Sequence, residues 1–480
     1  MLGINMSVWS TRSDSISTGV LFKRAPQART QLAANLSTAV TTVLRAKHRL
    51  AFVGLYVVMV LMYVRPQEVM PEVFGGLPMA KIATIATILI YVFSKLSAGE
   101  KLITWPLEMK MVALIWALGL IFLPFAVSPQ DSFDVLFDPF IKTVIIFIML
   151  INLVDTPKRL HLLLHILVVC QLLYAISAIK TFLEGGYSES ASFHYRIQGW
   201  GTLFANPNDL ASVLTVMLPF AVVFGLTRRG WVRLFYFACA GIAAVAILCT
   251  FSRSGFIGLV LSVGVIVWKL SGGRRVRVWL AVLVVVGVLS LAMPGKYVTR
   301  LATIFNPQTD TTHSAQERQE VLRRAATLAV SRSVVGVGMG NFHIYSIREM
   351  KAHNSYLETA SELGVVGLIA FLILIFTPIR SLRRIQRETK AGGSGPEREL
   401  FITSVCFQAS FVAYIIYSFF GSIQYFNFLY FGVAYVVAFQ RIYAAAASAK
   451  AGTAESTGLT GGTLWRPQRV RQLQLTEGSR

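Results

Sequence analysis

The sequence predicts an all-α polytopic membrane protein with about 12 transmembrane helices and one long loop between two of them. Of its 480 residues, 55% are hydrophobic, and the mean hydropathy is +0.61, which is more apolar than soluble domains usually are. Apolar runs of roughly 17 to 25 residues, long enough to cross a bilayer as helices, recur along most of the chain. Lysine and arginine gather in every second loop, as is typical of helical membrane proteins.

The expected spans follow one another along the apolar runs. They are 48–64, 77–95, 109–127, 139–155, 159–182, 208–226, 231–251, 254–269, 277–293, 363–379, 399–420 and 422–441. Because the strands of a closed barrel instead show short segments of alternating hydropathy, these continuous runs favour helices.

Positive charge alternates along the loops. The loops after even-numbered spans carry Lys95 and Lys101; Lys158 and Arg159; Arg228, Arg229 and Arg233; Lys269, Arg274, Arg275 and Arg277; and the dense run 380–398. Most loops after odd-numbered spans are acidic or neutral. Since positive loops stay in the cytoplasm, both termini are expected there. The same rule accounts for the net charge of +22 without nucleic-acid binding.

This order divides the chain into five parts. We expect a cytoplasmic tail over 1–46, nine spans in 47–293, a large periplasmic loop over 294–363, three spans in 364–444 and a disordered cytoplasmic tail over 445–480. Most other loops are short. A long loop with helical patterns of its own is usually functional, so any chemistry is expected on the outer face.

Within that loop, HSAQERQEVLRRAATLAVSR (313–332) predicts a helix with an arginine on its buried face. At 100° per residue, three residues lie within about 40° of Arg318: Leu322, Ala325 and Ala329. Arg323 and Arg324 lie on the opposite, solvated side. An arginine on a buried face is costly unless it is paired. We therefore expect Arg318 either in an internal salt bridge or bound to an anion, because a guanidinium group matches phosphate oxygens.

The next segment, VVGVGMGNF (334–342), predicts a tight bend. Its alternating glycines superficially resemble a nucleotide-binding loop. However, no strand precedes them and no GK[ST] follows, which disfavours that function. Glycine permits backbone conformations that bring one element close to another.

The segment MKAHNSYLETASELGVVG (350–367) leads into an apolar helix. This helix is expected to be capped by Asn354 or Ser355, with Glu358 completing an S-x-x-E capping box. His353 then stands at the helix N-terminus, where the helix dipole disfavours the imidazolium form. A neutral imidazole can act as a general base. The alternative is a histidine that only marks the membrane surface.

Two further features are expected at the same face. YRIQGWGTLFANPNDLA (195–211) contains Arg196, the only basic residue of its loop, and the pair Asn206 and Asn208 around a proline that favours a helix start. The asparagines are either caps or substrate ligands. Arg253 lies between two spans and either reaches the lipid headgroups or points into a cavity.

All four cysteines (Cys170, Cys239, Cys249 and Cys406) lie inside apolar runs. No CxxC pair or Cys/His cluster has the spacing of metal ligands. We expect buried packing residues, with neither disulfides nor a metal site.

Taken together, several motifs resemble the O-antigen ligase and polymerase superfamily, which includes O-antigen ligases, O-antigen polymerases and bacterial O-oligosaccharyltransferases. The motifs are the Arg-x-x-Gly stretch leading to Asn-Pro-Asn, the arginine-containing helix, GVGMGNF and HNSYLETASELGVVG. The resemblance covers about residues 195–380 and elsewhere depends on topology.

This resemblance implies a glycosyltransferase fold of the GT-C kind in the bacterial inner membrane, which takes a glycan from undecaprenyl diphosphate on the periplasmic side without metal, nucleotide or other cofactor. The essential histidine of the family falls on His353, its loop arginine on Arg318 and its earlier arginine on Arg196. Many relatives carry tryptophan four residues after the loop arginine, where this chain has Leu322.

We therefore expect His353 and Arg318 to be catalytic in an inverting transfer to an acceptor hydroxyl. The expected substrate-binding residues are Arg196, Arg253, Asn206, Asn208, Asn354 and Tyr356. Ligation of O-antigen to lipid A core is favoured. O-antigen or exopolysaccharide polymerisation and protein O-glycosylation are alternatives with other acceptors. A transporter of lipid-linked anions is an alternative of a different class, but it predicts charges near the membrane midplane.

Overall fold

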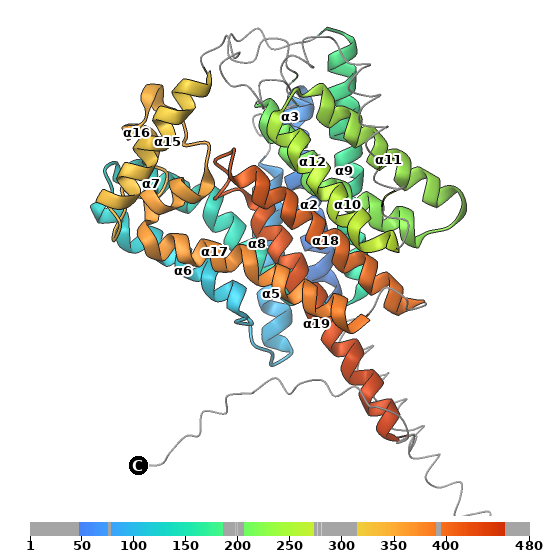
Figure 1. Ribbon diagram of the computed structural model, residues 1–480. Coiled ribbons are helices and arrows are strands. Elements are labelled where there is room, and N and C mark those ends of the chain that lie inside the picture. The colour runs from blue at the N-terminus through green and yellow to red at the C-terminus, as the bar shows by residue number, and fades with distance from the viewer. Residues whose placement is uncertain are drawn as a thin grey trace, which may run out of the picture.

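The computed structural model describes residues 48–74, 78–185, 197, 199, 206–272, 276, 280, 314–389 and 395–456. Within these ranges the regular structure is entirely helical (Figure 1). The predicted N-terminal tail (1–46), the span 277–293 apart from residue 280, and Arg196 lie outside the described residues. Of the predicted C-terminal tail, only the part that continues the last helix is described.

The first half of the chain provides five long helices joined by short ones. The long helices are α2 (Arg49–Val64), α5 (Met79–Ser97), α6 (Leu107–Phe122), α8 (Ile141–Leu153) and α9 (Pro157–Leu183). The short ones are α3 (Pro66–Val69), α4 (Pro71–Phe74), η1 (Leu123–Phe125), α7 (Pro129–Val135) and η2 (Leu136–Phe140).

The described residues of the second half form six long helices and a small polar segment. The long helices are α10 (Pro207–Thr227), α11 (Gly230–Cys249), α12 (Arg253–Leu270), α17 (Ser355–Thr389), α18 (Pro396–Ser418) and α19 (Asn427–Ser456). Between α12 and α17 lie α15 (Ser314–Ser331), α16 (Phe342–Tyr345) and η7 (Ile347–Glu349). We call residues 314–354 the cap.

Ten helices of the described residues are long and apolar enough to cross a membrane, and each corresponds to a predicted span. The predicted span 139–155 appears as α8, whose 13 residues follow the π-helical turn η2. The predicted span 422–441 begins later, at Asn427, because residues 419–426 form a turn after α18.

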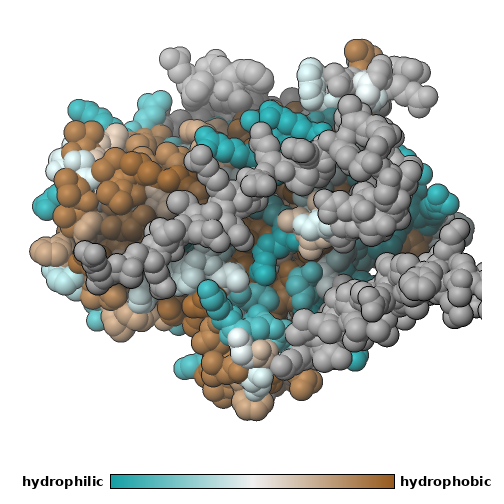
Figure 2. Space-filling view, turned by 90° about the horizontal axis from the view of Figure 1, so that it is seen from below, coloured by the Kyte–Doolittle hydropathy of each residue, from teal (hydrophilic) through white to brown (hydrophobic). Residues whose placement is uncertain are grey.

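The outer faces of several helices have the apolar character that lipid contact requires. On α5, Leu89 is 66% and Phe93 is 75% exposed. Seen from below, hydrophilic residues gather over the middle of the molecule and a broad hydrophobic area lies to one side (Figure 2). Exposed apolar area of this extent is typical of a membrane-contacting protein.

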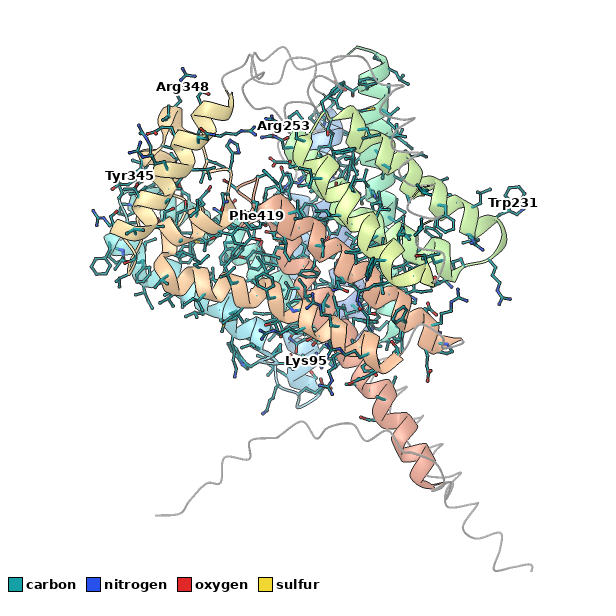
Figure 3. The ribbon with its side chains drawn as sticks, viewed as in Figure 1. Lys95, Trp231, Arg253, Tyr345, Arg348 and Phe419 are labelled. Atoms are coloured by element: carbon teal, nitrogen blue, oxygen red, sulfur yellow. The ribbon has the colours of Figure 1, made fainter. Side chains whose placement is uncertain are left out.

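Loops from alternate connections lie at opposite ends of the bundle. Lys95, in the last turn of α5 before a positively charged loop, lies at the lower end, whereas Arg253 and Arg348 lie at the upper end with the cap (Figure 3). This arrangement agrees with the alternation of loops in the sequence.

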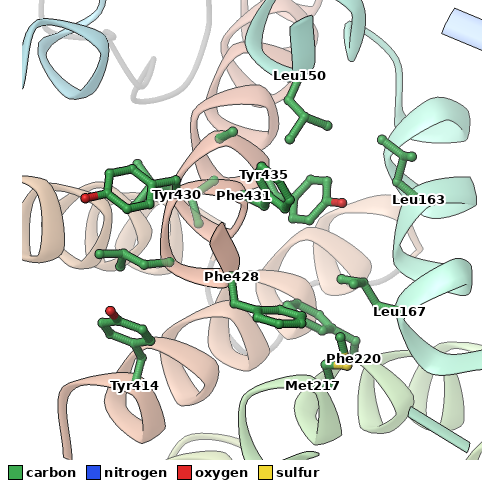
Figure 4. Packing of buried hydrophobic residues seen from close by; sticks show 14 of the residues in the cluster. Leu150, Leu163, Leu167, Met217, Phe220, Tyr414, Phe428, Tyr430, Phe431 and Tyr435 are labelled. Atoms are coloured by element: carbon green, nitrogen blue, oxygen red, sulfur yellow. The ribbon is translucent and has the colours of Figure 1, made fainter. Parts of the chain in front are cut away.

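The centre of the bundle is an aromatic core around α19 and α18. Phe428, Tyr430 and Tyr435 from α19 meet Tyr414 from α18 and Phe220 from α10 (Figure 4). Helix α18 also packs against α12 and α17. Burying a large aromatic side chain contributes roughly 1.5–3 kcal/mol, so this core fixes the position of the turn between α18 and α19.

Helix α17 consists of two helical parts joined at a glycine. Gly364 has φ +68°, and an added Cβ would come within 2.5 Å of the Val334 carbonyl oxygen. The Val365 amide donates to the Ser333 carbonyl at 2.7 Å. This close approach needs glycine, and it separates the polar start of α17, under the cap, from the apolar remainder.

A small apolar cluster holds the cap on α17. Val321 and Ala325 from α15 pack with Phe342 and Ala352, all fully buried. The cap is thus a structured segment at one end of the bundle, as the pattern over 313–332 predicts.

Candidate active site at the start of helix α17

His353 stands where the cap meets α17, in a left-handed backbone conformation with φ 52°. Its amide donates to the Ser422 hydroxyl at 3.0 Å, and Ser422 belongs to the turn after α18. Left-handed φ is uncommon for a residue with a side chain and marks a conformation that the surroundings enforce.

His353 is one of several strained positions in this short segment. Arg348 and Glu349 also have positive φ, at 49° and 57°. The guanidinium of Arg348 donates to Glu317 of α15 at 3.0 Å, which ties the segment to the cap helix. Clusters of such conformations are typical of functional sites.

The electrostatic environment keeps the His353 imidazole neutral. Burial, together with the positive charges of Arg318 and Lys351, lowers the pKa of His353 from 6.5 to about 4. This low pKa agrees with the neutral form expected from the sequence, with burial as its largest cause, followed by Arg318 and Lys351. A neutral imidazole has a nitrogen lone pair that can accept a proton.

Helix α15 buries part of the face that the helical wheel predicts. Of the residues that the wheel places beside Arg318, Ala325 is buried, whereas Leu322 and Ala329 are half-buried. Arg318 itself is half-buried, and Arg323 and Arg324 are exposed. Arg324 forms an ion pair with Glu320 on its own helix at 3.1 Å. The structure brings Arg318 within electrostatic reach of His353.

Asn354 caps α17. Its side-chain oxygen accepts from the amides of Tyr356 and Leu357, each at 3.0 Å. The predicted capping box of Ser355 and Glu358 is wrong. The Ser355 hydroxyl donates to the Gly421 carbonyl at 2.7 Å, and Glu358 accepts from the Ala352 amide.

Tyr356 is directed towards α18. Its hydroxyl donates to the Ile415 carbonyl at 3.2 Å. The centroids of the Tyr356 and Phe419 rings are 4.7 Å apart. This geometry gives Tyr356 and Asn354 structural roles whatever contacts they make with a substrate.

The glycine-rich segment of the cap is the tight bend that the sequence predicts. Gly336, Gly338 and Gly340 have φ of +74°, +100° and +78°. The Gly338 amide donates to the Glu362 carbonyl at 3.1 Å, and Ser132 of α7 donates to the Met339 carbonyl at 2.9 Å. The bend therefore lies between α7 and α17 and fixes the cap against both.

The asparagine pair joins two helix N-termini. Asn206 caps α10 by accepting from the Asn208 amide at 2.9 Å, which confirms the capping interpretation for Asn206. The Asn208 side chain accepts from the Ser252 hydroxyl at 2.8 Å, and Ser252 caps α12 directly before Arg253. Arg253 lies at the same end of the bundle as the cap (Figure 3).

Two buried carboxylates, Glu358 and Glu362, are 5% and 1% exposed. The sequence assigned Glu358 only to a capping box and did not single out Glu362. Glu362 accepts from the Phe342 amide at 3.1 Å and from the Tyr425 hydroxyl at 2.8 Å. Their i, i+4 spacing on one helix face is visible in the sequence. Their partners lie more than 60 residues away or in the cap, which local patterns do not reveal.

Lys351 was also missed. It is exposed, and its charge acts on His353, on Glu358 and on Asp209 of α10. Asp209 accepts from the Tyr417 hydroxyl of α18 at 3.1 Å. The site thus combines two cationic groups of the cap, Arg318 and Lys351, with polar groups from α10 and α18.

The four cysteines are free and buried, as the sequence predicts. Among the residues that the structure describes, no three histidine, cysteine or acidic side chains converge in a manner that would hold a metal ion.

Residues 238–372 match the model of the O-antigen ligase family. The matched segment contains Arg253, Arg318 and His353 and extends through α17 beyond the Gly364 break. No curated protein matches the chain. The match covers less than a third of this multi-pass membrane protein and agrees with the resemblance of its motifs to the O-antigen ligase-like superfamily.

Proposed function

We propose that this protein transfers a glycan from undecaprenyl diphosphate to an acceptor hydroxyl on the periplasmic side of the bacterial inner membrane. The acceptor that we favour is lipid A core, which makes the reaction O-antigen ligation. The observation that carries the proposal is the neutral His353, held in a left-handed conformation within electrostatic reach of Arg318.

In the proposed reaction, a ring nitrogen of His353 takes the proton of the acceptor hydroxyl. The acceptor oxygen attacks the anomeric carbon of the donor glycan from the face opposite the diphosphate. The bond between that carbon and the diphosphate oxygen breaks, and undecaprenyl diphosphate leaves with the electron pair. Attack from the opposite face inverts the anomeric centre, and Arg318 stabilises the negative charge that develops on the leaving group.

The low pKa of His353 fits a base that works in the presence of a bound diphosphate. Without substrate, burial and the cations Arg318 and Lys351 lower this pKa to about 4. A diphosphate beside these cations offsets their charge and raises the pKa of the imidazole. His353 then becomes a stronger base when the donor is bound, which is when deprotonation of the acceptor is useful.

Arg253 is proposed as a further ligand of the diphosphate, with Asn208 positioning the start of α12 beside it. Arg196 is proposed in the same role from the sequence. Apolar helices beside the site offer the polyprenyl chain a place in the bilayer.

The transporter alternative is less well supported. The cation that lowers the pKa of the proposed base most, Arg318, belongs to the cap helix α15 and not to a candidate span. A transporter site is expected near the membrane midplane, on interrupted helices.

The experiment that tests the function deletes the gene and separates surface polysaccharide by size. Ligation predicts lipid A core without long-chain polysaccharide, together with an accumulated undecaprenyl-linked polymer. Single repeat units on the core would instead indicate polymerisation, and normal polysaccharide with altered glycoproteins would indicate a protein acceptor.

Complementation then tests the site. His353→Ala and Arg318→Ala are expected to reproduce the deletion at normal protein levels. Arg323→Ala removes an exposed arginine from the same helix and serves as the matched control. Activity in both site variants would overturn the assignment of His353 and Arg318.

A further inference from the structure

The side chains of Ser422 and Glu358 form hydrogen bonds to the backbone at His353. The His353 amide donates to the Ser422 hydroxyl at 3.0 Å, and that hydroxyl in turn donates to a carboxylate oxygen of Glu358. The same oxygen accepts from the Ala352 amide at 2.9 Å. Glu358 therefore holds two consecutive backbone amides, one directly and one through Ser422.

The chain that supplies Ser422 is itself fixed. The Ser355 hydroxyl donates to the Gly421 carbonyl at 2.7 Å and accepts from the Ile423 amide at 2.9 Å, on either side of Ser422. The Tyr414 hydroxyl also donates to the Ile423 carbonyl at 2.8 Å. Ser422 thus has little freedom to follow His353 if the histidine relaxes.

We propose that Ser422 and Glu358 are positioning residues that hold His353 in its left-handed conformation and so aim its imidazole at the acceptor hydroxyl. This inference rests on the proposed function of His353 as the base. Neither residue needs to touch the substrate, because both act through the backbone of the histidine.

The physical reason is the cost of the conformation. A left-handed conformation is disfavoured for a residue with a side chain, and this segment contains three such residues. The hydrogen bond from the His353 amide to Ser422, whose hydroxyl in turn donates to the Glu358 carboxylate, opposes relaxation of the backbone. Loss of this bond removes a direct restraint on the left-handed conformation of His353.

A conservative variant separates positioning from charge. Gln424 donates to the second oxygen of Glu358 at 2.8 Å, and its own amide oxygen is buried without a hydrogen-bond partner. In Glu358→Gln, a flip of the Gln424 amide turns that oxygen towards the new NH₂ group. The oxygen of the new side chain still accepts from Ala352 and Ser422. Positioning therefore predicts near-normal activity for Glu358→Gln and strong loss for Glu358→Ala.

The test uses the full-length protein purified into lipid nanodiscs. The donor probe is undecaprenyl-diphosphate-linked polysaccharide, and the acceptor probe is lipid A core, both extracted from the deletion strain. For Ser422→Ala we expect kcat to fall about 10–100-fold with an unchanged KM for the donor, because misplacement of a reacting group affects the chemical step. Ser422→Thr keeps the hydroxyl and is expected to retain activity.

A pH profile separates a positioning role from a structural one. When Ser422→Ala frees the histidine backbone, the imidazole reaches more water and loses part of its contact with Arg318. The acid limb of kcat/KM is then expected to move upward, towards pH 6.5. Ser404→Ala is the matched control, since its hydroxyl only donates to Phe401 of its own helix. It should change neither kcat nor the pH profile.

The experiment distinguishes failure of the positioning role from failure of the proposed function. If His353→Ala is inactive while Ser422→Ala and Glu358→Ala resemble the wild type, the positioning role is wrong and the base stands. An active His353→Ala variant overturns both. An inactive Glu358→Gln variant that is folded by thermal denaturation assigns the carboxylate a role other than positioning and contradicts the inference.

Discussion

At the scale of single residues, the assignment of His353 as a base depends on its surroundings in the structure more than on its position in the sequence. The sequence places a histidine before a helix but leaves open whether it is a base or a surface residue. The structure adds a left-handed backbone, partial burial and two nearby cations, Arg318 and Lys351. These features make it the best candidate base in the described cap.

The pH dependence of the reaction is the first prediction at this scale. Because the pKa of His353 is lowered to about 4, the free enzyme keeps the base form at pH 5.5. An ordinary histidine with a pKa near 6.5 is about 90% protonated there, which would lower kcat/KM about tenfold. We expect kcat/KM, measured with purified protein, to change less than twofold between pH 7.5 and 5.5. An acid limb between pH 6 and 7 would contradict this.

Lys351→Gln provides the second prediction. The substitution removes one of the positive charges that lower the pKa of His353. The pKa should therefore rise, and the acid limb of kcat/KM should move to higher pH. Lys180→Gln is the control, because Lys180 is a surface lysine of α9 that pairs with Glu184. An unchanged profile in Lys351→Gln would show that this charge does not reach the imidazole.

At the scale of elements, the sequence predicted the cap helix and its buried face because helical periodicity is local. Ala325 is buried and Arg318 is half-buried beside it, while Arg323 and Arg324 face away from this side and are exposed. The sequence prediction was wrong for Glu358, whose S-x-x-E spacing suggested a capping box with Ser355. The carboxylate instead binds Ser422 and Gln424, which are brought near only by packing of the distant α18–α19 turn. Local motifs do not contain such contacts.

The glycine bend gives a prediction for the cap as an element. In Gly336→Ala, the new Cβ would overlap the Glu362 carbonyl, and φ is +74°. Gly99→Ala has a similar φ of +65° but nothing within 4 Å of the new Cβ. We expect Gly99→Ala to cost about 1 kcal/mol from backbone strain alone. Gly336→Ala should cost more and should expose the cap to protease.

Thermal denaturation in detergent and limited proteolysis measure this difference. Equal melting temperatures and equal cleavage of the two variants would show that the bend tolerates a side chain. In that case the close packing of the bend on α17 would not be what holds the cap in place.

At the scale of the whole molecule, composition and charge alternation predicted most of the architecture. In the part of the chain that the structure describes, ten predicted spans recur as helices long enough to cross a membrane, because continuous apolar runs are a strong signal. The late start of α19 and the short α8 were not predicted, since hydropathy alone does not distinguish an apolar turn or a π-helical segment from a regular helix. The polar contacts between the cap, α10 and α18 also depend on packing.

Topology is the prediction at this scale. The four native cysteines are buried, so single cysteines introduced at exposed positions can be labelled selectively. Val330→Cys in the cap, where Val330 is 79% exposed, should react with a membrane-impermeant maleimide from the periplasmic side. Lys101→Cys should react only after the inner membrane is opened. The reverse pattern would invert the proposed orientation.

The central claim is tested most directly by reconstituted transfer with wild type and His353→Ala. Purified protein in nanodiscs is supplied with undecaprenyl-diphosphate-linked polysaccharide and lipid A core from the deletion strain. We predict that the wild type forms polysaccharide joined to lipid A core and that His353→Ala loses about 10²–10⁴-fold in rate while still binding the donor. Unimpaired transfer by His353→Ala, or no covalent product with the wild type, would contradict the account.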